Sequence, residues 1–228
     1  ENTVPHEFRD AVREGIEKWN LAFEKIGFKN AIVAKQMPDD ATWDPADTRY
    51  NTIRWMVQPG SAYAVGPSRA NPFTGELYDA EIRIGSDIVS FYYNDLMEFI
   101  DPINLKAYED SIASHQNHDD CHYQDLMRHK MNYAWNYLTA TNQIKNSKKE
   151  MKQFVHEGIV DLILHEVGHT LGLRHNFKAS SVYSIEELSN PDFTEEYGIT
   201  GSVMDYNATN LLDGGHTHFQ TVPGPYDY

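Results

Sequence analysis

Four residues of this 228-residue chain could together bind a metal ion and act on water: His165, Glu166, His169 and His175. Residues four apart in an α-helix share one face and lie about 6 Å apart along its axis, so His165 and His169 could bind one ion. Glu166 follows the first histidine, where its carboxylate could reach a water on that ion without being a ligand itself. The chemistry that this pattern indicates is metal-assisted attack of water on a polar bond.

The third histidine can join the other two only if the helix ends before it. On a continuous helix His175 would lie about 15 Å from His165, whereas a zinc–nitrogen bond is about 2.1 Å long. Gly172 is placed to end the helix, because glycine adopts the left-handed conformation of helix ends without steric cost. The turned chain would then bring His175 back beneath the ion.

The helix that must carry the first two histidines is predicted over residues 148–171. Its apolar residues lie on nearly every side, which is typical of a helix buried within a domain. Ser147, with Glu150 three residues later, matches a capping box at its start. Gly158 and Gly168 lower its helix propensity by about 1 kcal/mol each, so we expect other elements to pack closely there.

The full motif HExxHxxGxxH is followed some thirty residues later by Ser202-Val203-Met204-Asp205-Tyr206. Together the two resemble the metzincin clan of zinc endopeptidases, in which a methionine turn, here with Met204, lies beneath the zinc. The run HEVGHTLGLRHNFKAS is most similar to a group of large, little-characterised bacterial zinc-dependent metalloproteases, and the likeness extends over most of the chain. Asn176, after the third histidine, departs from the residues that astacins, matrixins, serralysins and adamalysins favour there.

The resemblance implies an α+β, metzincin-like fold. This has a twisted, mostly parallel sheet with an antiparallel edge strand, two long helices and a small irregular C-terminal lobe. We expect one catalytic domain over residues 1–228, divided into an upper lobe at 1–172 with the active-site helix and a lower lobe at 173–228 with the methionine turn. Because little chain precedes the first helix or follows the turn, we expect a domain cut from a longer protein with flanking segments.

The same resemblance implies the roles of the site residues. One catalytic Zn²⁺ would be held by His165, His169 and His175, and Glu166 would be the general base for hydrolysis of a peptide or protein. Tyr206 lies two residues past Met204, where astacins and serralysins have a tyrosine that stabilises the oxyanion. A buried structural tyrosine is the alternative for this position.

The first part of the chain predicts a helix followed by strands. An amphipathic helix is indicated over residues 6–27 by apolar residues three and four apart, and strands are indicated over 31–37 and 51–58. A loop is predicted over 60–75 and an alternating strand over 76–84. By resemblance this strand is the edge along which a peptide substrate pairs, through Tyr78, Asp79, Ala80 and Glu81. An interior strand is the alternative, because alternation does not distinguish edge from centre.

Residues 114–123, SHQNHDDCHY, hold three histidines, two aspartates and Cys121. A second metal site there is one interpretation, but a polar loop is favoured because the spacings match no recognised site. Helices are predicted over residues 123–144 and, in the loop-rich part after His175, over 185–189.

Composition limits the partners. A formal net charge of −15 argues against nucleic acid or an anionic membrane surface as partner, and the chain has no apolar run long enough to cross a membrane. The acidic residues could bind Ca²⁺, but no calcium-loop pattern assigns a site. Cys121 is the only cysteine, so no internal disulfide can form. An extracellular, periplasmic or cell-surface location is implied by the resemblance alone.

Two other functions compete with a peptidase. A catalytically silent, zinc-containing peptide-binding module is one, although such a module would have no use for Glu166. A zinc hydrolase of non-peptide amides is the other, and the expected peptide-accepting strand argues against it.

Overall fold

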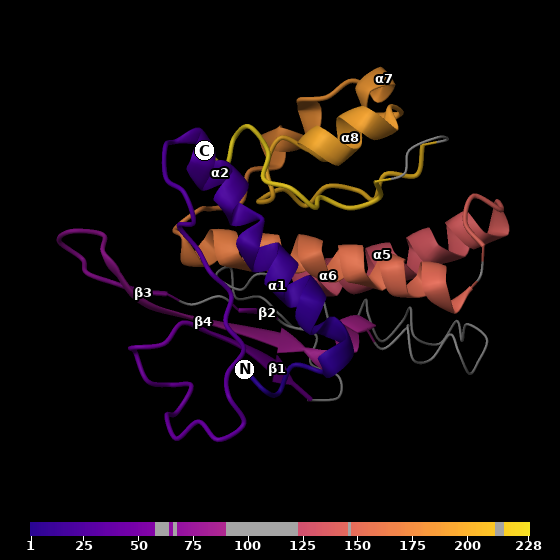
Figure 1. Cartoon of the computed structure of the whole chain (residues 1–228). Coiled ribbons are helices and arrows are strands. Elements are labelled where there is room, and N and C mark those ends of the chain that lie inside the picture. The colour runs from indigo at the N-terminus through magenta and orange to yellow at the C-terminus, as the bar shows by residue number, and fades with distance from the viewer. Residues whose placement is uncertain (58–63, 66–67, 90–122, 146, 213–216) are drawn as a thin grey trace, which may run out of the picture.

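The structure is a computed structural model that describes residues 1–57, 64–65, 68–89, 123–145, 147–212 and 217–228. A long helix, α6, runs through the middle of the molecule, with a sheet on one side and the C-terminal segment on the other (Figure 1). Helices α1 and α5 lie beside α6 and complete the layer that it forms. The fold is therefore α+β, as the sequence predicts, and its sheet is small and mixed.

Helix α6 spans Lys148–Thr170 and agrees with its predicted bounds to within one residue. The hydroxyl of Ser147 accepts a hydrogen bond from the backbone N–H of Glu150 (3.3 Å), which confirms Ser147 as the cap, the first half of the predicted capping box. Most of the helix after Phe154 is buried, as its all-round apolarity indicates. A buried central helix gives any site at its end a rigid base.

The predicted N-terminal helix is present in three pieces: η1 (His6–Phe8), α1 (Arg9–Glu17) and α2 (Trp19–Lys25). Helix α1 lies close to α6 at Gly15, where a Cβ would come within 2.6 Å of Ile163 Cβ. The indole N–H of Trp19 donates to the carbonyl of Leu164 in α6 (3.1 Å). The apolar face of the first helix therefore packs on the helix that carries the histidines.

The sheet has β4 at its centre. Strand β1 (Thr52–Met56) pairs parallel with β4 (Leu77–Gly85), while β2 (Ala64–Val65) and β3 (Ser68–Ala70) pair antiparallel with it. The described sheet thus has one parallel and two antiparallel pairings rather than mostly parallel ones.

The strand predicted as the sheet edge, β4, lies between β1 and β2 in the described sheet. Asp79 and Ala80 pair with β3 and Glu81 pairs with Thr52 of β1, while Tyr78 falls at the irregularity in the pairing with β3. A peptide-pairing role for these four residues stays a prediction. The antiparallel neighbours β2 and β3 arise instead from the part predicted as a loop. The alternation in β4 correctly marks a sheet, but it carries no information on how many neighbours the strand has.

Two further predictions concern the first half of the chain. Residues 31–37, predicted as a strand, have no regular secondary structure, whereas the strand predicted at 51–58 is β1.

Helix α5 (Tyr123–Ala140) confirms the helix predicted at 123–144 in shorter form. The side-chain amide of Gln124 exchanges two hydrogen bonds with the backbone of Gly85, which ties the start of α5 to the end of β4.

The C-terminal part is irregular and contains η3 (Phe177–Ser181), α7 (Ile185–Leu188) and α8 (Pro191–Tyr197). Helix α7 was predicted, and α8 was not. One hydrophobic cluster joins this part to the rest, because Val203, Met204 and Phe219 share it with α5 and α6. The proposed division into lobes at residue 172 stays a prediction.

The histidine-rich run at 114–122, with Cys121, lies outside the described residues. The possible binding of Ca²⁺ stays unassigned to any residue. Among the described helices none is long and apolar enough to cross a membrane. The 3-10 helix η2 (Ser86–Val89) follows β4 and packs near α5.

Candidate metal centre

Three imidazoles meet at the end of α6. His165 and His169 lie one turn apart on the helix, and His175 returns to them from the segment that follows. Their ligand atoms all lie within 4.8 Å of one another, and the Nε2 atoms of His169 and His175 are 3.0 Å apart. Two nitrogens bound to one tetrahedral zinc are about 3.3 Å apart, so small side-chain shifts suffice to accommodate the ion.

The end of α6 brings the third histidine back. Gly172 has φ +91°, and its N–H donates to His169 O (2.9 Å), while the N–H of Leu173 donates to Gly168 O (3.0 Å). This is a Schellman motif, which reverses the chain through a left-handed residue that glycine adopts without strain. The predicted role of Gly172 is thereby confirmed.

Backbone carbonyls determine the tautomers of the two helical histidines. His165 Nδ1 lies 2.7 Å from Val203 O, and His169 Nδ1 lies 3.1 Å from Leu173 O. A carbonyl oxygen can only accept, so both Nδ1 atoms must carry the hydrogen. In the neutral ring this leaves the Nε2 lone pair for a metal, an arrangement typical of metal-binding histidines.

Burial keeps these rings neutral. His165 is completely buried, and this lowers its pKa well below the usual range; the neighbouring His169 lowers it further. Burial also lowers the pKa of the half-buried His169. Since only a neutral imidazole can bind a metal, His165 and His169 do not have to lose protons before binding at neutral pH.

Met204 lies directly beneath the helix turn that carries the ligands. A Cβ on Gly168 would overlap Met204 Sδ, so the side chain fills the space that glycine leaves. The N–H of Asn176 donates to Met204 O (2.9 Å), which joins the residue after the third histidine to the methionine turn. The side chain of Asp205, also in this turn, accepts hydrogen bonds from Ser180 and Thr200.

Glu166 and Tyr206 each neighbour a residue of the histidine cluster. Glu166 is fully buried and adjoins His165 in the helix. The half-buried ring of Tyr206 lies edge-on to His175, with centroids 4.6 Å apart, and 5.6 Å from the ring of His165. By contrast, Tyr78, Asp79, Ala80 and Glu81 lie in β4, where Asp79 and Ala80 pair with β3 and Glu81 pairs with β1.

A second group behind His165 was not predicted. The Tyr123 ring stacks on the His165 ring, its hydroxyl donates to Asp161 Oδ1 (2.9 Å), and Lys130 Nζ lies 5.2 Å from the Tyr123 ring centroid. Burial raises the pKa of Asp161 to about 6 and lowers that of Lys130. One sequence signal existed: Asp161 is the single charged residue among the apolar residues 159–164 and lies one turn before His165.

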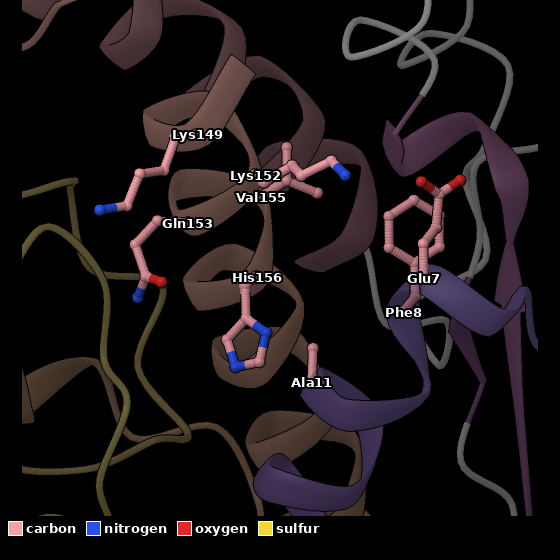
Figure 2. A pocket seen from close by; sticks show the side chains of 8 residues that line it. All are labelled: Glu7, Phe8, Ala11, Lys149, Lys152, Gln153, Val155 and His156. Atoms are coloured by element: carbon pink, nitrogen blue, oxygen red, sulfur yellow. The ribbon is translucent and has the colours of Figure 1, made fainter. Parts of the chain in front are cut away.

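Figure 2 shows a pocket of about 390 Å³ elsewhere on the molecule, between η1, α1 and the first half of α6. His156 in its wall lies 2.8 Å from Glu14 Oε2. Its lining contains none of the three clustered histidines and consists of Glu7, Phe8, Ala11, Lys149, Lys152, Gln153, Val155 and His156. Lys152 precedes His165 by about 20 Å of helix, so this pocket is not part of the metal centre.

Residues 147–228 match a family model described as Met-zincin. No curated protein and no solved structure matches the chain. The matched part begins at the cap of α6 and contains the three histidines, Glu166 and the turn at Met204. Over these residues the chain is metzincin-like, in agreement with the resemblance of its motifs.

Proposed function

We propose that this chain is a zinc-dependent endopeptidase in which His165, His169 and His175 hold the metal and Glu166 is the general base. The observation that carries the proposal is the convergence of the three imidazoles, with Nε2 of His169 3.0 Å from Nε2 of His175. The Met-zincin match over residues 147–228 supports the same reading.

The donor set suits a catalytic zinc. Three neutral nitrogen ligands are typical of zinc sites that keep a coordination position for water, whereas structural sites use four protein ligands. When bound, zinc would polarise a peptide carbonyl and lower the pKa of water towards 7.

Glu166 would be the general base and then the general acid in this reaction. Its carboxylate, adjacent to the first ligand and excluded from bulk solvent, would accept a proton from the attacking water and pass it to the amine that leaves. The hydroxyl of Tyr206, whose ring lies beside that of His175, would donate to a developing oxyanion. The chain would thus supply the base and a hydrogen-bond donor, and a peptide or protein would be the substrate.

Digestion of a mixed peptide library by the zinc-loaded chain, followed by mass spectrometry, tests the proposal. Glu166→Gln should retain zinc and lose turnover by about a hundredfold or more, because only the base is removed. Glu157→Gln makes the same chemical change on α6, two turns before the site, and should leave turnover unchanged. Zinc-loaded wild type that cleaves no peptide would contradict the peptidase and favour a silent zinc-containing peptide-binding module.

A further inference from the structure

The last residues of the chain close on the methionine turn. Asp227 is buried, and its Oδ2 accepts hydrogen bonds from the N–H groups of Val203 and Gly224, each 2.8 Å long. Its Oδ1 accepts from the hydroxyl of Ser202 (2.5 Å). Three donors therefore converge on one carboxylate, two of them from the turn.

The two segments touch through their main chains. The N–H of Tyr226 donates to Gly201 O (2.9 Å). A Cβ on Gly224 would overlap the backbone of Gly201 and lie 2.8 Å from Ser202 N. Glycine at position 224 permits this approach, which brings the Asp227 side chain into reach of the turn.

Asp227 fixes the peptide units on both sides of Val203. The unit before it, between Ser202 and Val203, donates the Val203 N–H to Asp227 directly. The unit after it contains the Val203 carbonyl and the Met204 N–H; this N–H donates to Ser202 Oγ (3.0 Å), and the Ser202 hydroxyl donates to Asp227. The orientation of the Val203 carbonyl is thereby determined by Asp227 from two sides.

That carbonyl is the one that accepts from His165 Nδ1 (2.7 Å). We propose that Asp227 is a positioning residue that orients His165 through Val203. The inference rests on the proposed role of His165 as a zinc ligand. Hydrogen-bonded partners beyond the ligands themselves commonly change metal affinity about 10- to 100-fold when removed, so the effect is measurable.

The test compares Asp227→Ala, Asp227→Asn and Asn190→Ala with wild type in zinc affinity, by competition with a chromophoric chelator. Asp227→Ala loses all three hydrogen bonds and should weaken zinc binding about tenfold or more. Asp227→Asn keeps an oxygen that can accept from the two N–H groups, so its zinc affinity should lie between those of wild type and Asp227→Ala. Asn190→Ala, the control, removes a side-chain oxygen that accepts from two backbone N–H groups at the start of α8 and should leave zinc affinity unchanged.

Replacing Zn²⁺ with Co²⁺ adds a second measurement, the visible absorption spectrum, which a loss of stability alone would not change. The visible spectrum of Co²⁺ depends on ligand geometry, so its bands should shift in Asp227→Ala and not in Asn190→Ala. Should Asp227→Ala fail to fold, Ser202→Ala removes the link to the Met204 N–H and should weaken zinc binding in the same direction.

Unchanged zinc affinity and cobalt spectrum in these variants would overturn the positioning role and leave the proposed function intact. Wild type that binds no zinc would instead overturn the proposed function, and the inference with it.

Discussion

The ring of Tyr123 stacks on the imidazole of His165, with centroids 3.9 Å apart and planes inclined by 13°. The tyrosine is completely buried, and its hydroxyl donates to Asp161, one turn before His165 on α6. The Tyr123 ring of α5 therefore packs flat against His165, the first proposed ligand. The hydrogen bond to Asp161 in α6 holds the Tyr123 ring in this position. The Val203 carbonyl holds the same imidazole at Nδ1.

Two substitutions of Tyr123 separate the ring from the hydroxyl. Tyr123→Phe should keep the stack, leave zinc affinity nearly unchanged and lower the free energy of unfolding by about 1–3 kcal/mol, because Asp161 loses a buried donor. Tyr123→Leu removes the flat surface and should also weaken zinc binding. Zinc competition and urea unfolding measure the two effects. Equal zinc affinities in both variants would contradict a role for the stack.

Tyr206→Phe tests the proposed oxyanion donor. A hydroxyl that acts mainly in the transition state should lower kcat about 10- to 1000-fold when removed, with little change in KM. A purely structural hydroxyl would cost about 1 kcal/mol of stability and leave kcat alone. Tyr183→Phe is a matched control, because its hydroxyl donates to Tyr197 O (3.3 Å) away from the metal centre. Kinetics and melting temperature should be measured on the same preparations.

Local signals predicted the elements that carry the site. The Ser147 cap, the apolar run of α6 and the stop at Gly172 each act within a few residues, so the sequence alone bounded the helix and placed His165 and His169 on one face. The return of His175 followed from the same geometry, because only a turned chain could bring it close enough.

Contacts between distant segments could not be predicted. The neighbours of β4 depend on β2 and β3, which are two and three residues long and lie in a run rich in glycine and proline. Residues 31–37 have the composition of a strand but find no partner in the described sheet. Asp227 reaches Val203 across 24 positions of chain, and nothing in the spacing of the two residues indicates this contact.

Gly168→Ala tests how closely the methionine turn approaches α6. The new methyl group would overlap Met204 Sδ and lie 3.1 Å from Trp19 Cζ2. We expect a loss of about 1–3 kcal/mol in the free energy of unfolding, since overpacking outweighs the gain in helix propensity, together with weaker zinc binding. Gly158→Ala makes the same change against the flexible end of Met131 and should leave zinc affinity unchanged. Zinc affinity equal to wild type in Gly168→Ala would show that the turn can move without disturbing the ligands.

The buried carboxyl of Asp161 should make stability depend on pH. Burial raises its pKa from 3.8 to about 6, while Lys130 and the Tyr123 hydroxyl act in the opposite direction. The folded state thus binds the proton more tightly than the unfolded state. The contribution of this group is fully present below about pH 4 and is lost as the pH rises through 6. A shift of this size corresponds to a decrease on the order of 3 kcal/mol in the free energy of unfolding.

Asp161→Asn does not titrate and should lack this decrease. Urea unfolding of both metal-free proteins at pH 4, 5, 6 and 7 measures it, and the comparison cancels the titration of groups that the two proteins share. The difference in unfolding free energy, wild type minus Asp161→Asn, should fall between about pH 4 and 6 and then level off. A difference that rises over this range would mean that Lys130 stabilises the ionised carboxylate more than burial penalises it, and that the pair is charged in the folded protein.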